Sequence, residues 1–355
     1  MKGLILSGGK GTRLRPLTYT GAKQLVPVAN KPVLFYAIED LVEAGVTDLG
    51  IVIGDTGDQI RAAVGGGERF GAKVTYIAQD APLGLAHAVK IARDFIGDER
   101  FILFLGDNFI RDGIVPQVDA FRAGGMNCQI ILFRVPNPQN LGVAVLNADG
   151  TVARLVEKPA EFISDLALVG IYMFDRHIFD AIARITPSRR GELEITDAIQ
   201  KLIEMGRIVK PHLLQGEWID TGKRSDMLDA NRLILETLDM QIAGTVDEHS
   251  QVVGRVVLAE GAHVVRSVVR GPVIIGANTR IEDAFVGPFT AIDHDCVVRR
   301  AEIENSIVMD GSHISDVRDR IADSLIGRSV EIRQSAPTPK ALRLLLGDHS
   351  QVGVV

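Results

Sequence analysis

The chain has 355 residues, of which 46% are hydrophobic and 24% charged, so it is long enough for one large domain or two. A net charge of −6 argues against a general nucleic-acid binder, because such proteins carry a basic face toward phosphates. No apolar run reaches the length of a membrane span, and the apolar start Met1–Leu6 ends at Gly8 and Gly9 without a signal-peptide cleavage pattern. Cys128 and Cys296 lie far apart, so we expect two free thiols and a reducing, cytoplasmic compartment.

The first two-thirds of the chain alternates strand-like and helix-like patterns. Short apolar runs predict strands at Gly3–Ser7, Leu49–Ile53, Lys73–Ile77 and Phe101–Leu105, and helical spacing predicts helices at Pro32–Ala44, Gln59–Val64 and Leu85–Phe95. Strands separated by helices are typical of a mostly parallel sheet covered on both faces. Ligands in such sheets bind at the carboxyl ends of the strands. We therefore expect Gly8–Arg13, Gln79–Gly84 and Asp107 at one edge of the sheet.

After about residue 240, helical spacing gives way to short apolar pairs that recur roughly every six residues. A hexapeptide repeat of this kind favours a parallel β-helix of five or six coils over a generic β-sandwich. The register slips between Ile281 and Val286 and again near Glu302–Ile307, so we expect irregular coils at both places. The aliphatic residues that begin the pairs are Ile275, Ile281, Val286, Ile292, Val298, Val308, Ile314, Ile326 and Val352.

A glycine-rich turn follows the first predicted strand, at Leu6–Leu14. Gly8, Gly9 and Gly11 allow the backbone to approach an anion closely with its N–H groups pointing inward. The turn is neither of the two common nucleotide motifs, since Leu14 replaces the third glycine of a dinucleotide-binding turn and the spacing of a Walker loop is absent. Taken alone, the turn could equally be structural.

The longer string Gly8–Thr18, followed by Lys23–Pro32, matches the signature of the nucleotidylyltransferases that make NDP-sugars. Over essentially its whole length the chain resembles the long form of the glucose-1-phosphate thymidylyltransferases. The resemblance implies a Rossmann-like α/β nucleotidyltransferase domain over residues 1–240 and a left-handed β-helix over residues 241–355. It also implies transfer of a thymidylyl group from dTTP to α-D-glucose 1-phosphate with release of pyrophosphate. A UTP-using or other sugar-1-phosphate nucleotidyltransferase remains the alternative.

The resemblance implies roles for residues on both sides of that reaction. On the nucleotide side, Gly8, Gly9, Gly11, Thr12, Arg13 and Lys23 would hold the triphosphate, and Gln24, Gln79 and the backbone near Gly84 would read the pyrimidine. Asp107 and Asp220 would bind Mg²⁺, which prefers oxygen ligands. On the sugar side, the implied residues are Gly142, Glu157, Lys158, Tyr172 and Thr196. Arg13, Lys23 and Lys158 would supply the charges for direct in-line attack, and no covalent intermediate is expected.

Two other functions remain open at this stage. The β-helix could be an acyltransferase that uses His263, His294 or His313, although turn or coil-face positions are the expected ones. The chain could also be a non-catalytic regulator, which the intact motif residues disfavour. We expect His87, His177 and His212 to serve packing or surface roles. We expect the β-helix to mediate homo-oligomer formation, since a solenoid leaves apolar area to cover.

Overall fold

The computed structural model describes residues 1–9, 11–334 and 347–353. Its contacts divide the chain into two compact units that are interleaved along the sequence. The first unit holds Met1–Lys10 and Val33–Asp220, and the second holds Gly11–Pro32 and Thr221–Val355. The domain boundary expected at residue 240 therefore stays a prediction. Within the described residues, no helix combines the length and the apolar character needed to cross a membrane.

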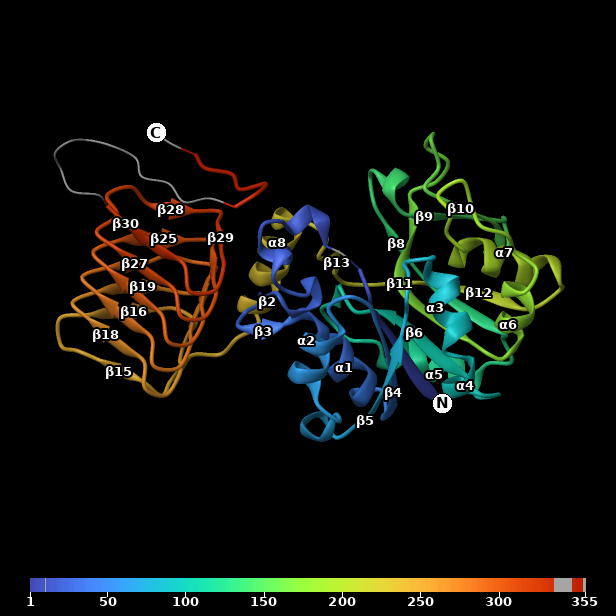
Figure 1. The fold of residues 1–355 in the computed structure, drawn as a ribbon, viewed down its shortest axis with the longest axis horizontal. Helices are drawn as coiled ribbons and strands as arrows, with labels where there is room; N and C mark the ends of the chain where they lie inside the picture. The colour runs from blue at the N-terminus through green and yellow to red at the C-terminus, as the bar shows by residue number, and fades with distance from the viewer. Residues whose placement is uncertain (10, 335–346, 354–355) are drawn as a thin grey trace. The chain divides into compact units, whose positions relative to one another are not determined.

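The first unit is built on a nine-stranded mixed sheet (Figure 1). Four strands at one side, β6, β1, β4 and β5, are neighbours and run parallel. The antiparallel strand β11 continues the sheet beyond β6 and pairs with both β8 and β9. The strands are β1 (Lys2–Ser7), β4 (Asp48–Ile53), β5 (Lys73–Ala78), β6 (Phe101–Leu105), β8 (Cys128–Arg134), β9 (Gly142–Leu146), β10 (Val152–Glu157), β11 (Leu166–Phe174) and β12 (Val209–Leu213). The expected strands are confirmed.

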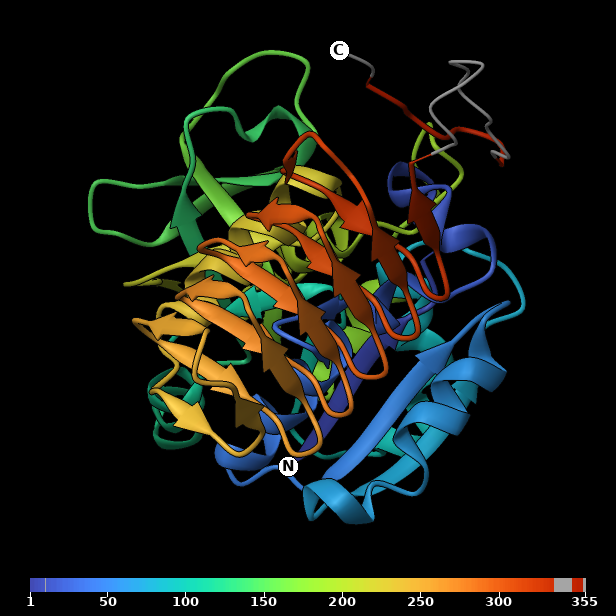
Figure 2. The same cartoon turned by 90° about the vertical axis from the view of Figure 1, so that its left-hand side faces the viewer.

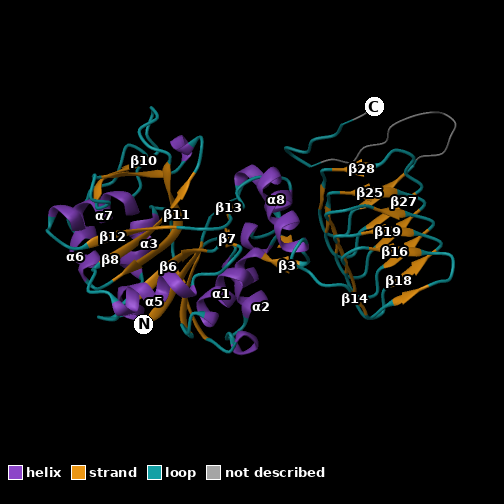
Figure 3. Cartoon of the chain, turned by 180° about the vertical axis from the view of Figure 1, so that it is seen from behind, coloured by secondary structure: helices purple, strands orange, loops and turns teal. Residues whose placement is uncertain are grey.

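Helices lie on both faces of this sheet (Figure 3). Alternation along β1 separates the faces: Leu4 belongs to the core cluster that contains residues of α3, α6 and α7, whereas Gly3 faces Leu41 of α1. The expected helix at 85–95 is wrong as one piece, because Ala92 leaves the helical path and its N–H bonds the Val89 carbonyl oxygen three residues back, at 3.1 Å. The helices are α1 (Val33–Glu43), α2 (Gly57–Val64), α3 (Leu85–Ile91), α4 (Arg93–Ile96), α5 (Val115–Ala123), α6 (His177–Ile182) and α7 (Ile195–Glu204).

The second unit contains Gly11–Pro32, the part of the signature string that we call the signature segment, together with one helix and the repeat region. The signature segment forms three short 3₁₀ turns, η1 (Thr12–Leu14), η2 (Leu17–Tyr19) and η3 (Lys23–Leu25), and then a tight hairpin of β2 (Pro27–Val28) and β3 (Lys31–Pro32). Helix α8 (Arg224–Leu235) leads into the repeat region.

The repeat region is a parallel β-helix with three faces, and Figure 2 shows its coils stacked one after another from yellow to red. Its faces are stacks of six, six and five parallel strands, as the hexapeptide pattern predicts. The strands are β14 (Gln241–Ile242), β15 (Thr245–Val246), β16 (Gln251–Val253), β17 (Val256–Leu258), β18 (His263–Val265), β19 (Val268–Arg270), β20 (Val273–Ile275), β21 (Arg280–Glu282), β22 (Phe285–Val286), β23 (Thr290–Ile292), β24 (Val297–Arg299), β25 (Glu302–Glu304), β26 (Ile307–Val308), β27 (His313–Ser315), β28 (Ile321–Ala322), β29 (Leu325–Ile326) and β30 (Glu331–Arg333).

Two expectations about the repeat need correction. Val256 pairs with Val273, and Val273 with Thr290, so each coil here takes 17 residues and one of its three sides has five. The five-residue step from Ile281 to Val286 is therefore a regular feature and no irregularity. The repeat also does not extend to 352–353, where the described residues form no strand.

The second expected slip is confirmed. Ala291 pairs with Ile307, a step of 16 residues, and Ile307 with Leu325, a step of 18. The interior of the coils is aliphatic and includes the buried Cys296, and both cysteines of the chain are free, as expected.

Candidate active site

Gly8, directly after β1, lies beside Gln79 in the first unit. Gly8, Gly54 and Gln79 line a small hollow of about 20 Å³, together with Asp55 and Asp80. A methyl group added at Gly8 would lie 3.3 Å from Oε1 of Gln79, so a side chain at this position would crowd that amide. The structure thus brings together two segments that the sequence predicts at the same edge of the sheet, one after β1 and one after β5.

His87, on α3, contacts Gln79. The amide Nε2 of Gln79 lies 3.1 Å from Nδ1 of His87. Burial, and secondly the charge of Lys90, lower the pKa of His87 from its ordinary 6.5, which favours the neutral imidazole that can accept this hydrogen bond. His87 therefore fixes which end of the Gln79 amide is free. The sequence alone predicts only a packing or surface role for His87, since no local motif links the two residues.

The segment after Gln79 approaches the backbone of a second predicted element. Gly84 has a φ of 104° and lies so close to Leu193 that a methyl group there would meet its carbonyl oxygen at 2.4 Å. Leu193 donates its N–H to the Leu83 carbonyl oxygen (2.8 Å), and Ala86 donates to the Leu193 carbonyl oxygen (3.0 Å). Only glycine fits this close approach. The contact joins Gln79–Gly84 to the segment Gly191–Asp197.

The predicted phosphate ligands of the signature segment lie in the second unit. Gly11 adopts a left-handed φ of 59°, and a methyl group there would lie 2.7 Å from Cβ of Lys23. Thr18 Oγ1 donates to the Gly11 carbonyl oxygen at 2.7 Å, which closes the loop on itself. Thr12 and Arg13 are exposed, and the guanidinium of Arg13 lies against the backbone of Gly222. Folding thus packs Lys23 against the glycine turn.

Gln24 is only 2% exposed. Its Oε1 has no hydrogen-bond partner among the residues that the structure describes. A buried amide oxygen without a partner is costly, so such groups often serve a ligand.

The two predicted metal ligands lie on neighbouring strands of the first unit. Asp107 directly precedes β7 (Asn108–Ile110), and Asp220 ends β13 (Trp218–Asp220). These strands are antiparallel, and Asp220 is the partner of Asn108. Asn108 is 2% exposed, donates to Oδ1 of Asp107 (3.2 Å) and accepts from Nε1 of Trp218 (2.6 Å). Asn108 thus orients Asp107, a contribution that the sequence analysis missed.

Asp107 and Asp220 offer carboxylate oxygens from paired segments of the backbone, and such oxygens are the preferred ligands of Mg²⁺. The donor set of Asp107 and Asp220 therefore fits the metal that the sequence resemblance implies.

Four of the five predicted sugar-side residues, Gly142, Glu157, Lys158 and Thr196, form one cluster at the start of α7 and the β9–β10 pair. Glu157 at the end of β10 is the partner of Gly142, and a methyl group at Gly142 would meet Leu168, Thr196 and Glu157. Thr196 Oγ1 donates to Glu157 Oε2 at 3.3 Å. The ammonium of Lys158 lies 3.6 Å from Glu157 Oε1, and its side chain is 42% exposed. Because Gly142 has no side chain, Glu157 and Thr196 can approach each other beside it.

Arg190 joins the same cluster and was not singled out from the sequence. Its guanidinium contacts Glu157 at 3.4 Å, Glu192 at 2.9 Å and Glu194 at 3.6 Å. Burial raises the pKa of Glu157, while Lys158 lowers it and Glu194 raises it further. Three carboxylates around one arginine leave the cluster short of positive charge. An anionic ligand there would depend on Lys158 and Arg190.

Tyr172 differs from the other sugar-side residues because it lies in the core of the sheet. It is 4% exposed and stacks on Phe174 with ring centroids 6.1 Å apart. Burial, and secondly the charge of Glu157, raise the pKa of Tyr172 well above its ordinary value. A side chain so buried offers little surface to a sugar, and the sugar-side role of Tyr172 stays a prediction.

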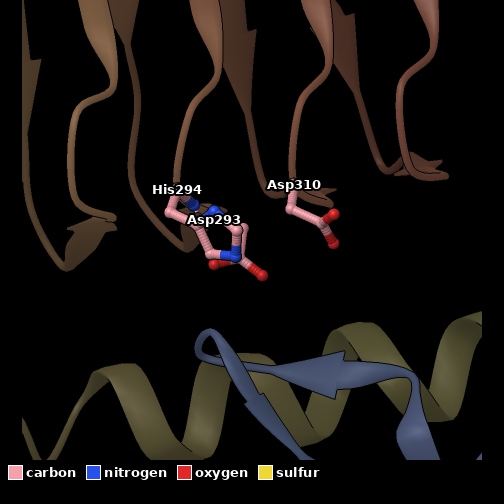
Figure 4. Close-up of side chains that lie close together, drawn as sticks. All are labelled: Asp293, His294 and Asp310. Atoms are coloured by element: carbon pink, nitrogen blue, oxygen red, sulfur yellow. Dashed lines mark hydrogen bonds between the residues drawn. The ribbon is translucent and has the colours of Figure 1, made fainter.

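A further group with metal-ligand chemistry lies on the β-helix. Atoms of Asp293, His294 and Asp310 that could bind a metal lie within 4.8 Å of one another, and Figure 4 shows these residues on turns facing hairpin β2–β3 (blue) and helix α8 (olive). Asp310 already pairs with Arg328 at 2.8 Å, and His294 with Asp295 at 2.7 Å. We assign no ion to this group.

Comparison with known proteins defines the class. A family model described as nucleotidyl transferase matches residues 2–237, and the chain belongs to this family. The chain is 55% identical over 354 residues to the glucose-1-phosphate thymidylyltransferase of Streptomyces griseus, covering 100% of this chain and 99% of that one. It is 52% identical over 355 residues to the enzyme of that name from Streptomyces antibioticus, with 100% and 99% covered.

A solved structure is also similar. A Bacillus anthracis protein described as a glucose-1-phosphate thymidylyltransferase, in complex with a sucrose, matches with a TM-score of 0.62 at 35% identity. The match covers 66% of this chain and 94% of that chain. The fold and family expected from the sequence are confirmed.

Proposed function

We propose that this nucleotidyltransferase transfers the thymidylyl group of dTTP to glucose 1-phosphate and releases pyrophosphate. The observation that carries the proposal is the full-length identity of 55% to a relative of that name. The described geometry supports it, because Gly8 lies beside Gln79 and the Glu157 cluster holds the partly exposed Lys158. A Gln amide offers a donor and an acceptor, which suits a thymine edge at Gln24 and Gln79.

The proposed chemistry is direct attack. A phosphate oxygen of glucose 1-phosphate forms a bond to the α-phosphorus of dTTP, and the bond from that phosphorus to the pyrophosphate oxygen breaks. A phosphate monoester is already ionised near neutral pH, so no general base is required. Arg13 and Lys23 would neutralise the triphosphate, and Lys158 would anchor the attacking phosphate.

Asp107 and Asp220 would hold Mg²⁺, which supplies charge stabilisation and substrate alignment when bound. We further propose a cytoplasmic location, and a homo-oligomer formed through the β-helix.

A matrix of nucleoside triphosphates against sugar 1-phosphates, followed by pyrophosphate release with Mg²⁺, tests the substrates. We expect the highest kcat/KM for dTTP with glucose 1-phosphate. UTP differs from dTTP in its base by one methyl group, worth about 1 kcal/mol in an apolar pocket, so UTP should be the nearest competitor. A clear preference for UTP, or turnover with no pair, would contradict the proposal. Exchange of labelled pyrophosphate into dTTP without sugar phosphate would contradict direct attack.

Replacing Lys158 by methionine should raise KM for glucose 1-phosphate by about 10-fold to 100-fold, because a hydrogen bond to a charged group is lost. KM for dTTP should stay within about twofold, since the resemblance places Lys158 on the sugar side. Lys210→Met on the exposed face of β12 is the matched control and should change neither constant. Equal increases of both KM values in Lys158→Met would rule out the assigned role.

The contact between His87 and Gln79 predicts a pH dependence. Because the pKa of His87 is lowered, the neutral ring persists to a pH below 6.5 and accepts from Gln79. At lower pH the ring gains a proton at Nδ1 and can no longer accept. KM for dTTP should therefore rise by about threefold to tenfold on acidification and stay constant above pH 7. His87→Asn, which does not titrate, should flatten this rise; an unchanged profile in that variant would refute the link.

A further inference from the structure

The tip of hairpin β2–β3 is fastened to the β-helix by one buried amide. Asn231 of α8 is 0% exposed and uses both ends of its side chain. Its Oδ1 accepts from the Ala29 N–H at the hairpin tip (2.9 Å), and its Nδ2 donates to the Phe289 carbonyl oxygen of the β-helix (2.9 Å). A buried amide with both ends bound to backbone specifies one relative position of the two segments.

The hairpin tip needs such a partner. Ala29 and Asn30 have φ values of 47° and 60°, both in the left-handed region that a two-residue turn of this kind requires. Ala29 is 7% exposed, so its N–H would be buried without a partner if Asn231 were absent. An Ala in this conformation is strained, and the surrounding contacts must hold it there.

A second hydrogen bond joins the turn of the hairpin to strand β23 of the β-helix. Nδ2 of Asn30 donates to the Ile292 carbonyl oxygen at 2.7 Å. Phe289 precedes β23 and Ile292 ends it, so the turn is tied at both ends of this strand. The Oδ1 of Asn30 is buried and has no partner in the part of the chain that the structure describes. The bond through Nδ2 is therefore what fixes this side chain.

The fastened hairpin continues directly into the proposed nucleotide ligands. Turn η3, with Lys23 and Gln24, ends at Leu25, two residues before β2 begins. Lys23 in turn packs against Gly11. The same loop has a further contact with the β-helix, because a methyl group at Gly327 would lie 3.0 Å from Leu17. Contacts accordingly group Gly11–Pro32 with the C-terminal part of the chain.

We infer that Asn231 is a positioning residue for nucleotide binding. Through Asn231, the β-helix holds the signature segment in its binding conformation. Asn231 does not touch substrate. It acts through Ala29 on the backbone that carries Lys23 and Gln24. This inference rests on the proposed function, because it takes those two side chains as nucleotide ligands. According to this inference, the β-helix contributes to nucleotide binding by positioning Lys23 and Gln24, without catalysing a reaction itself.

A graded pair of variants in the full-length protein tests this inference. Asn231→Asp keeps the acceptor for Ala29 but loses the donor to Phe289, and Asn231→Ala loses both. We expect KM for dTTP to rise by about threefold in Asn231→Asp and about tenfold in Asn231→Ala, with KM for glucose 1-phosphate unchanged. Hydrogen exchange of residues 23–32 should accelerate in the same order. The exchange readout remains decisive even if the wild-type chain shows no turnover with dTTP.

The matched control is Arg232→Met. Arg232 also joins α8 to the β-helix, through Nε to Asn305 Oδ1 at 2.7 Å, and does not hold the hairpin turn as Asn231 does. This control should lower the melting temperature without changing KM for dTTP or exchange at 23–32. If Asn231→Ala does not fold, Asn30→Gly removes the second bond while allowing the left-handed φ. An unchanged KM and unchanged exchange in the Asn231 variants, or equal effects in Arg232→Met, would overturn the inference.

Discussion

Replacement of Arg13 by alanine should lower kcat by about 10²-fold to 10³-fold, the loss expected when one preorganised charge near the reacting phosphate is removed. Arg13 is exposed in η1 and lies against Gly222, where a smaller side chain leaves no buried cavity. The fold should therefore stay intact. Pyrophosphate release measures the effect, and thermal unfolding monitors the fold.

Two further variants sharpen this result. Arg13→Lys keeps the charge but loses the planar fork, so it should recover only part of the rate. Arg207→Ala removes an exposed arginine in the loop between α7 and β12 and should leave kcat unchanged. Near-normal turnover in Arg13→Ala would exclude the assigned role in charge stabilisation.

Replacement of Asp220 by asparagine should have the second large effect. The amide keeps the shape of the side chain but lacks the negative charge that Mg²⁺ requires. We expect kcat at a fixed low Mg²⁺ concentration to fall by about 10²-fold or more, and part of it to return when the Mg²⁺ concentration is raised. Titration of activity with MgCl₂ measures both effects.

Asp107→Asn should behave in the same way, because Asp107 precedes the strand that pairs with β13. Asp98→Asn, in an exposed turn before β6, is the control and should not shift the Mg²⁺ titration. A normal Mg²⁺ dependence in both Asp107→Asn and Asp220→Asn would exclude the two aspartates as metal ligands.

The sequence predicts the parallel strands well, because each buried strand is an unbroken apolar run that ends in glycine or a polar turn. Leu49–Ile53 and Phe101–Leu105 are examples that the structure confirms. The sequence also predicts the β-helix, because its repeat can be recognised within a short continuous stretch of the chain. The length of a coil was harder to read, since the five-residue side at Ile281–Val286 becomes regular only when the partner coils are compared.

The contacts that orient the site were not predictable from local pattern. His87 meets Gln79 because α3 returns beside the end of β5, and Arg190 meets Glu157 across 33 positions of the sequence. Asn231 meets Ala29 across 202 positions. Such contacts depend on how whole helices and strands pack together. A single histidine, arginine or asparagine in the sequence does not indicate which distant residue it will contact. The residues of continuous motifs, by contrast, could be named in advance.

The most direct test of the proposed activity is to incubate the purified chain with dTTP, glucose 1-phosphate and Mg²⁺. Phosphorus NMR then measures the phosphate-containing substrates and products. We expect each dTTP consumed to yield one dTDP-glucose and one pyrophosphate, and we expect omission of the sugar phosphate to stop the reaction. Pyrophosphate release without sugar phosphate, or no dTDP-glucose with both substrates present, would contradict the proposed activity.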